Sequence, residues 1–174
     1  MSDKPLLTPI PYEDFVKDVR VIAAAVKADG WAPDFLIGIG RGGLVPGAYL
    51  SHATGINLLS VDHSAKIYGF GDRLLAELAR QSGEGKRLLV VDDINDSGKT
   101  IRYLREAMDG AGGVSENVRF AVLLNNIRSP AKVDYCSRTI DRHTSKDWFV
   151  FPWEAMAADA VLHEDAMAVP ERLA

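Results

Sequence analysis

Apolar residues in the first part of the chain recur at the spacing of one helical face. Within residues 12–29, the side chains of Phe15, Val19 and Ile22 fall on that face. Gly30 follows directly, and glycine is common just after a helix because it adopts a left-handed backbone without strain. The pattern predicts an amphipathic helix that ends at residue 29.

Farther along the chain, short apolar runs alternate with segments of helical periodicity. Runs that are apolar throughout, rather than at every second residue, are typical of parallel strands buried on both faces. Their alternation with helices predicts an α/β fold, with a parallel twisted sheet covered by helices on both faces. Strands are expected at residues 35–40, 56–62, 87–93 and 118–126, with a short last strand within 147–154 that ends at Pro152. Helices are expected at residues 44–55, 72–83 and 99–113 and in the C-terminal segment 155–174, in which we identify no chemistry.

Length and charge limit the classes of protein to consider. The 174 residues suffice for one domain with a sizeable core, and we expect residues 1–174 to form a single domain. The formal net charge of -4 predicts no basic surface, so no nucleic-acid partner is expected. No apolar run approaches the roughly 20 residues of a membrane span, and the N-terminus lacks the apolar stretch of a signal peptide. We therefore expect a soluble, cytoplasmic protein with no membrane partner.

A glycine-rich segment, GIGRGG at residues 38–43, follows the first predicted buried strand. Ligands of open α/β sheets bind beyond the carboxyl ends of the strands, and exposed backbone N–H groups there bind phosphate. Arg41 adds a planar cation suited to phosphate oxygens. The segment also fits the G-x-G-x-x-G pattern of dinucleotide-binding folds, with Asp62 near the position of the ribose-binding acid. The helix that precedes this strand and the shortness of the chain weigh against a dinucleotide-binding fold but do not exclude it.

A second motif, LLVVDDINDSGKT at residues 88–100, leads a buried strand into three aspartates. A P-loop would need glycine where Asp93 stands, so that motif is excluded. The small residues 97–100 offer hydroxyls, close backbone approach and a helix N-terminus, which together suit a phosphate group. Asp92 and Asp93 beside that phosphate suit ribose hydroxyls or hydrated Mg²⁺, a cation that prefers oxygen ligands.

Three segments together resemble one known family. VVDDINDSGKT closely resembles the signature with which type I phosphoribosyltransferases bind 5-phosphoribosyl 1-pyrophosphate (PRPP). GRGGLVPGAYLSHATGI is similar to the pyrophosphate loop and following helix of the bacterial xanthine–guanine and related hypoxanthine phosphoribosyltransferases. DWFVFPWE is similar to their C-terminal base-binding segment. The segments occur in the order typical of that family and span about residues 38–154, most of the chain.

The resemblance implies a role for each residue of the phosphate-binding motifs. Asp96 would be the catalytic base, near N7 of a purine. Asp93, with Asp92 as a second candidate, would bind Mg²⁺ together with PRPP. Arg41 and Gly42 would hold the pyrophosphate. The residues implied to bind the ribose and 5′-phosphate of PRPP are Asp92, Asp93, Asp96, Ser97, Gly98, Lys99 and Thr100.

The resemblance also implies how the base is held. Trp148 would stack on the purine, and the backbone around Phe149 and Glu154 would read its 2-position. Trp153 is expected to be a packing residue. The xanthine–guanine enzymes hold the purine 6-oxygen with a lysine where this chain has Asn125, and an amide, which can donate or accept, enforces a 6-oxo group less strictly.

As a whole, the resemblance implies a purine phosphoribosyltransferase. It would transfer the 5-phosphoribosyl group from PRPP to xanthine, guanine or hypoxanthine in purine salvage, release pyrophosphate and use Mg²⁺ as cofactor. The family also implies a type I phosphoribosyltransferase fold with a small C-terminal base-binding hood, a homo-oligomer, and a mobile active-site loop within residues 62–86. Two alternatives stay open, a non-catalytic PRPP-binding regulator on the same fold and, more weakly, an NAD-binding protein built on residues 38–43.

Overall fold

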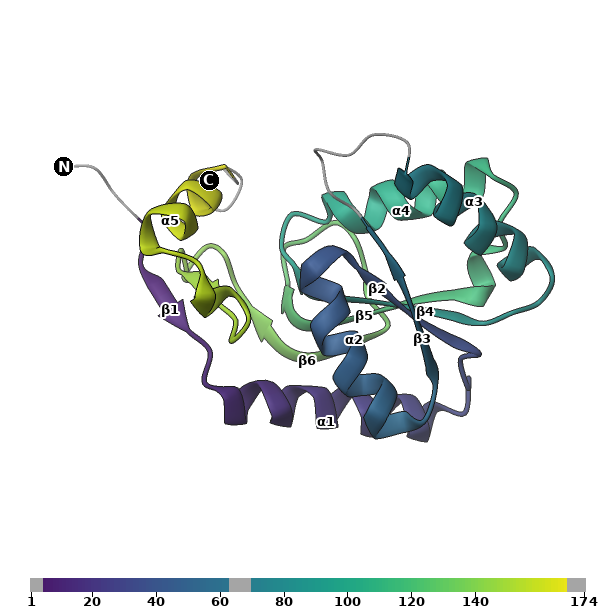
Figure 1. Ribbon diagram of the computed structural model, residues 1–174, viewed down its shortest axis with the longest axis horizontal. Coiled ribbons are helices and arrows are strands. Elements are labelled where there is room, and N and C mark those ends of the chain that lie inside the picture. Colours follow the sequence, from purple (N-terminus) through teal and green to yellow (C-terminus); the bar gives the residue numbers. More distant parts are fainter. Residues whose placement is uncertain (1–4, 63–69, 169–174) are drawn as a thin grey trace.

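The computed structural model describes residues 5–62 and 70–168, and the centre of this part of the chain is a five-stranded sheet (Figure 1). The strands are β2 (Phe35–Ile39), β3 (Asn57–Val61), β4 (Leu88–Asn95), β5 (Val118–Asn126) and β6 (Tyr135–Ile140). They lie in the order β3-β2-β4-β5-β6, and every neighbouring pair is parallel. The parallel sheet predicted from the alternating pattern is therefore confirmed, and the carboxyl ends of its strands lie along one edge.

Helices cover both faces of the sheet, as the pattern predicts. They are α1 (Tyr12–Asp29), α2 (Gly40–Thr54), α3 (Phe70–Gly83) and α4 (Lys99–Gly110). Successive strand residues point to opposite faces. Leu36 and Leu89 pack into the core beneath α1 and α2, whereas Ile37 and Val90 pack beneath α3 and α4. Gly30 ends α1 in the left-handed conformation, with φ of 74°.

Three elements, α2, β4 and β6, differ from the sequence prediction. α2 begins at Gly40 rather than at residue 44, so most of the glycine cluster forms the first turn of the helix instead of a loop before it. β4 continues through the acidic pair to Asn95. β6 is absent from the prediction because this edge strand carries polar residues and has no continuous apolar run.

A smaller layer lies beside the sheet, and we call it the hood. It consists of β1 (Leu7–Pro9), β7 (Trp148–Val150), the 3₁₀ turn η2 (Glu154–Met156) and α5 (Asp159–Met167). β1 pairs in parallel with β7, which joins the start of the described chain to its C-terminal part (Figure 1). A second 3₁₀ turn, η1 (Ser115–Asn117), precedes β5. Within residues 5–62 and 70–168, no helix is both long enough and apolar enough to cross a membrane.

Candidate active site

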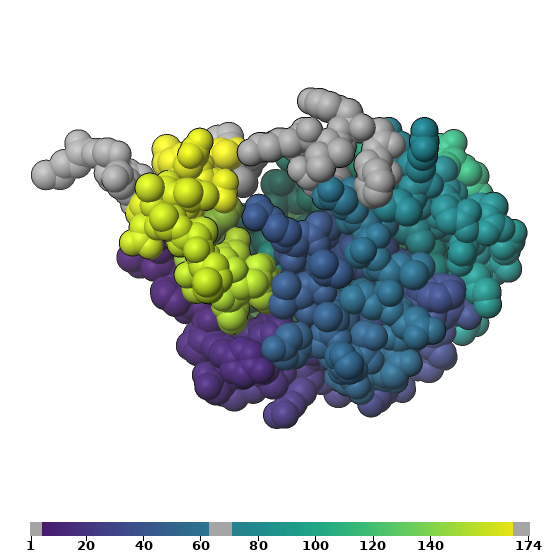
Figure 2. All heavy atoms as spheres, viewed as in Figure 1, coloured from purple at the N-terminus to yellow at the C-terminus, as the bar shows by residue number. Residues whose placement is uncertain are grey.

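A cavity of about 870 Å³ opens at the carboxyl ends of β2 and β4. Its walls come from the first turn of α2, the end of β4, the start of α4 and the C-terminal segment 153–165. In Figure 2 the yellow residues of that segment lie beside the dark blue residues of α2. Residues of both predicted phosphate-binding motifs therefore meet at one site, as the parallel topology predicts. The predicted site residues that line the cavity are Arg41, Gly42, Asp92, Asp93, Thr100 and Glu154.

Two glycines allow α2 to start directly against the acidic end of β4. A Cβ atom at Gly43 would lie 2.0 Å from the carbonyl oxygen of Val91, a separation that no real side chain could adopt. A Cβ atom at Gly42 would lie 2.5 Å from a carboxylate oxygen of Asp93. The absence of these side chains brings the N-terminus of α2, with its partial positive charge, next to the carboxylates.

Asp92 and Asp93 form a pair of carboxyl groups whose pKa values are both raised. Burial raises the pKa of Asp92 well above its usual value, and the charge of Asp93 adds to the shift. Burial and then the charge of Glu154 raise the pKa of Asp93 to about 7. Burial also raises the pKa of Glu154, and Asp165 adds to this while Arg41 opposes it.

The raised pKa of Asp93 predicts how stability depends on pH. The folded protein holds the Asp93 proton up to a pH of about 7, whereas the unfolded chain releases it near the ordinary pKa of 3.8. The stabilising contribution is therefore present below about pH 4 and lost as the pH rises through about 7. We expect Asp93→Asn to raise the Tm of the ligand-free protein at pH 8 by about 2–4 °C, which corresponds to about 1 kcal/mol in a domain of this size. At pH 4 it should have little effect.

Thermal unfolding of both proteins across this pH range checks the prediction. Asp141→Asn is the matched control, because hydrogen bonds from Arg128 lower the pKa of Asp141 to about 2 and so remove its titration from this range. An equal effect of Asp93→Asn at pH 4 and pH 8 would show that Asp93 does not titrate in this way.

The acidic pair suits Mg²⁺ better as part of a substrate complex than as a protein cage. Within the described residues, no group of three or more histidine, cysteine or acidic side chains is arranged to hold a metal ion. Mg²⁺ usually keeps several waters and binds through one or two carboxylates together with substrate phosphates. Asp92 and Asp93, beside two helix N-termini that favour phosphate, fit that arrangement.

The segment 96–100 forms the turn from β4 into α4. Gly98 has φ of 75°, which glycine adopts at little cost, and a Cβ atom there would lie 2.8 Å from the Cβ of Ala131. The backbone N–H of Lys99 points to the hydroxyl of Ser97, at 3.4 Å. Thr100 lines the cavity, whereas Lys99 is exposed. The turn thus presents the N-terminus of α4 near the cavity, as the small residues predict.

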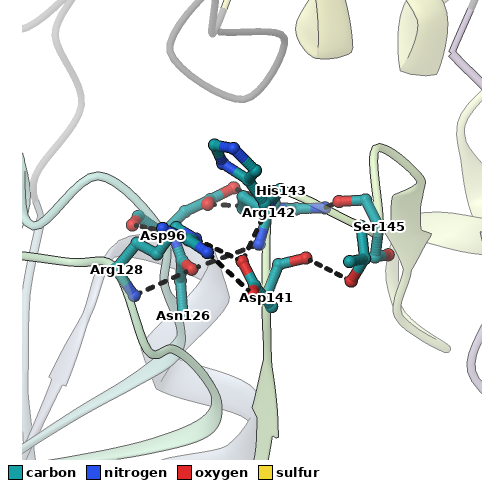
Figure 3. Close-up of polar contacts among 8 residues, drawn as sticks. Asp96, Asn126, Arg128, Asp141, Arg142, His143 and Ser145 are labelled. Carbon is teal, nitrogen blue, oxygen red and sulfur yellow. Dashed lines mark hydrogen bonds and ion pairs between the residues drawn. The ribbon is translucent and has the colours of Figure 1, made fainter.

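Asp96 is paired with a residue that the sequence analysis does not single out. Arg142, which follows β6, donates from Nε to both carboxylate oxygens of Asp96, at 2.9 and 3.1 Å, and from a terminal nitrogen to one of them at 2.7 Å (Figure 3). Arg142 is 5 % exposed. The two residues lie 46 positions apart, so no local motif could have indicated the pair. Asp96 is therefore held by a residue of the segment between β6 and β7, and it is not among the residues that line the cavity.

Asn125 and Asn126 have different surroundings. The side-chain oxygen of Asn125 accepts a hydrogen bond of 2.8 Å from the amide of Asn95. The amide of Asn126 instead donates to the backbone oxygen of Asp96, at 3.0 Å (Figure 3). Of the two neighbours, Asn126 is the one in contact with the predicted catalytic residue.

The aromatic residues of the hood divide between cavity and core. Trp148 and Phe149 lie in β7 and are half-buried, and the guanidinium carbon of Arg142 lies 5.2 Å from the centre of the Phe149 ring. Trp153, expected only to pack, also lines the cavity. Its ring stacks on Phe151 with 4.9 Å between ring centres. Trp153 is therefore a further candidate for contact with a ligand.

The C-terminal segment contributes to the cavity wall, although the sequence suggested no chemistry for it. Met156, Val161 and Asp165 line the cavity, and Asp165 is close enough to raise the pKa of Glu154. No motif marks these residues, because they reach the site through the packing of the hood. Asp62, at the start of the predicted mobile loop, also lines the cavity, whereas residues 63–69 of that loop lie outside the described residues.

Comparison with known proteins assigns the chain to one family. The chain matches the phosphoribosyl transferase domain family over residues 11–159. It is similar to the crystal structure of a purine phosphoribosyltransferase from Pyrococcus horikoshii Ot3, with 26% identity, a TM-score of 0.64, and coverage of 85% of this chain and 94% of that one.

Two further structures share the fold at lower identity. A hypothetical protein from Neisseria gonorrhoeae with bound ppGpp has 23% identity and a TM-score of 0.66, with 94% of this chain and 97% of that chain covered. The Helicobacter pylori xanthine-guanine-hypoxanthine phosphoribosyltransferase has 21% identity and a TM-score of 0.61, with 91% and 99% covered. The family match includes both predicted phosphate-binding motifs, which assigns the glycine cluster to a phosphoribosyltransferase rather than to a dinucleotide-binding fold. The chain belongs to the phosphoribosyl transferase domain family, and the protein is a phosphoribosyltransferase enzyme.

Proposed function

We propose that this enzyme transfers the 5-phosphoribosyl group of PRPP to a 6-oxopurine (xanthine, guanine or hypoxanthine) and releases pyrophosphate, as in purine salvage. One observation carries the proposal: the acidic pair Asp92–Asp93 lies between the N-termini of α2 and α4 at a single cavity. A ribose that carries a phosphate on one side and a pyrophosphate on the other needs this arrangement of two anion sites around hydroxyl-binding carboxylates.

The proposed reaction requires little covalent chemistry from the protein. The bond between C1 of the ribose and the pyrophosphate oxygen breaks, and a bond from C1 to a ring nitrogen of the base forms. Arg41 and Gly42 bind the departing pyrophosphate, and residues 96–100 hold the 5′-phosphate. Asp92 and Asp93 orient the ribose, and Asp96 takes the proton from the imidazole ring of the base. Closure of the site would exclude water, which could otherwise attack C1.

Mg²⁺ is the proposed cofactor. Bound with PRPP, it would neutralise charge on the pyrophosphate as the C1–O bond breaks. Asp93, with Asp92 beside it, would hold it, because these carboxylates face the cavity and lie under the anion-binding end of α2. Binding of the cation would also favour the ionised form of both carboxyl groups.

A purine is the proposed acceptor because the relative from Pyrococcus horikoshii is a purine phosphoribosyltransferase at 26% identity. The 6-oxopurine assignment rests on the resemblance of residues 147–154 to the base-binding segment and on the name of the Helicobacter pylori enzyme. Trp153 supplies a large aromatic face at the cavity, and Trp148, in β7 of the hood, is the second aromatic candidate. With Asn125 in place of the lysine, we expect weaker discrimination against adenine than in lysine-bearing relatives.

Two measurements on the unmodified protein test the function. PRPP with Mg²⁺ should raise the Tm, because the ligand binds the folded state, and NAD should not. Pyrophosphate release should require PRPP, Mg²⁺ and one of hypoxanthine, guanine or xanthine, with adenine slower. A PRPP-dependent rise in Tm without pyrophosphate release from any of the four bases would refute the proposed acceptor, and no response to PRPP would refute the donor.

A further inference from the structure

Arg142 is a buried cation that belongs to neither of the two phosphate motifs nor to the base-binding segment. It follows β6 and is 5 % exposed, whereas the nearby Arg128 is an exposed residue that pairs with Asp141. A buried arginine is uncommon in proteins unless its charge is paired and its N–H groups are hydrogen-bonded. The partners of Arg142 therefore indicate what the residue does.

The guanidinium of Arg142 joins two segments that are far apart in the sequence. On one side it donates to both carboxylate oxygens of Asp96, at 2.7–3.1 Å. On the other side it donates to the backbone oxygens of Asp147, at 2.6 Å, and Ser145, at 3.3 Å, in the segment that leads into β7. The central carbon of the guanidinium lies 5.2 Å from the centre of the Phe149 ring. One side chain thus connects the phosphate turn to the base-binding segment.

The side chain of Asn126 strengthens this connection. Its amide donates to the backbone oxygen of Asp96, at 3.0 Å, and its oxygen accepts from the backbone N–H of Arg142, at 3.4 Å (Figure 3). Asp96 is therefore held through its backbone from one side and through its carboxylate from another. A planar two-pronged contact between arginine and carboxylate fixes the plane of the carboxylate as well as its position.

The energetics favour a role in orientation over a role in stability. A buried ion pair adds little net stability, because the cost of removing both charges from water offsets their attraction. Orientation matters more for a general base, since a misplacement of about 1 Å can lower a rate by about 10²-fold. An ionised carboxylate has about four acceptor sites, so Asp96 can accept a proton from a ligand while it stays bound to Arg142.

From this geometry we infer that Arg142 is a positioning residue for Asp96. Arg142 fixes the carboxylate of Asp96 relative to the base-binding segment, so that the carboxylate and the segment can contact the same purine at the same time. The inference rests on the proposed function, because it takes Asp96 as the group that receives the proton of the base. Arg142 acts through Asp96, to which its guanidinium is hydrogen-bonded.

The test compares Arg142→Ala, Arg142→Lys and Asp96→Asn with the double variant Asp96→Asn/Arg142→Ala. We expect Arg142→Ala to lower kcat by about 10²-fold, the cost typical of a misplaced catalytic group, with a smaller change in the KM for PRPP. Arg142→Lys keeps the charge but loses the two-pronged contact, so its kcat should lie in between. In the Asp96→Asn background, removal of Arg142 should cost less than about threefold, because residues that act as a unit are non-additive.

Guanidinium ion at millimolar concentration provides a readout that a purely structural role would not affect. It should raise the kcat of Arg142→Ala at least about tenfold, because it can occupy the vacated position beside Asp96. Arg128→Ala is the matched control, since Arg128 makes a similar contact with Asp141 close by but none with Asp96, and its kcat should stay at the wild-type value.

The outcomes separate the inference from the function. Two outcomes would overturn the positioning role while the function stands. One is a wild-type kcat in Arg142→Ala. The other is a loss of kcat on removal of Arg142 that is equal in the wild-type and Asp96→Asn backgrounds and that guanidinium does not restore. If Arg142→Ala does not fold, the kcat of Arg142→Lys and its non-additivity with Asp96→Asn decide in the same way. A wild-type protein that releases no pyrophosphate with any purine would overturn both.

Discussion

Asp96→Asn is expected to lower kcat by about 10²–10⁴-fold, the usual loss when a general base is removed. The substitution keeps the shape of the side chain and one oxygen that can accept from Arg142, so the fold should be retained. The KM for PRPP should change much less, because the helix N-termini and the acidic pair that are proposed to bind PRPP are unchanged. Steady-state kinetics with hypoxanthine or guanine as acceptor measure both parameters.

The control for this variant is a carboxylate at the opposite edge of the sheet. Asp34 precedes β2, accepts a hydrogen bond from the backbone of Arg87 at 2.8 Å and pairs with Lys86. Asp34→Asn should leave kcat at the wild-type value. If Asp96→Asn also turned over at the wild-type rate, Asp96 would be no more than a structural residue of the turn before α4.

Gly43→Ala is expected to lower the stability of the folded protein strongly. Its Cβ atom would lie 2.0 Å from the carbonyl oxygen of Val91, so α2 must move away from β4. We expect the Tm to fall by about 6–12 °C, which corresponds to about 3 kcal/mol for a domain of this size. PRPP should then raise the Tm less than in the wild type, because the N-terminus of α2 no longer faces the acidic pair.

Gly110→Ala is the matched control for that variant. Gly110 is the last residue of α4, and a Cβ atom there would meet nothing within 4 Å. Alanine is the better helix former, so the Tm should stay the same or rise slightly. A Gly43→Ala protein that melts at the wild-type temperature would show that α2 and β4 are not as closely packed as the structure has them.

The sequence predicts the central layers well because their signals are local. The apolar face of α1, its glycine stop and the apolar runs of β2 and β4 each occupy one short stretch, and all are confirmed. β1 and β6 escape prediction for physical reasons. β1 has three residues, too few for a periodic pattern, and β6 is an edge strand with polar positions.

The same distinction applies to the site. The phosphate motifs are contiguous in the sequence, because a turn that binds phosphate needs small residues next to one another. Chemistry and spacing alone therefore indicated Asp92, Asp93 and the segment 96–100, and the topology of a parallel sheet indicated that Arg41 would lie near them.

What the sequence by itself determined about this protein is the α/β order of its elements, the position of the two turns predicted to bind anions and the resemblance to a phosphoribosyltransferase. Only the tertiary structure decided that Arg142 pairs with Asp96, that Asn126 rather than Asn125 contacts Asp96, and that α5 closes one wall of the cavity. The physical reason is that these contacts join segments far apart in the chain. The contact between the buried arginine and its carboxylate depends on how the hood packs against the sheet. No spacing of residues along the sequence predicts that packing.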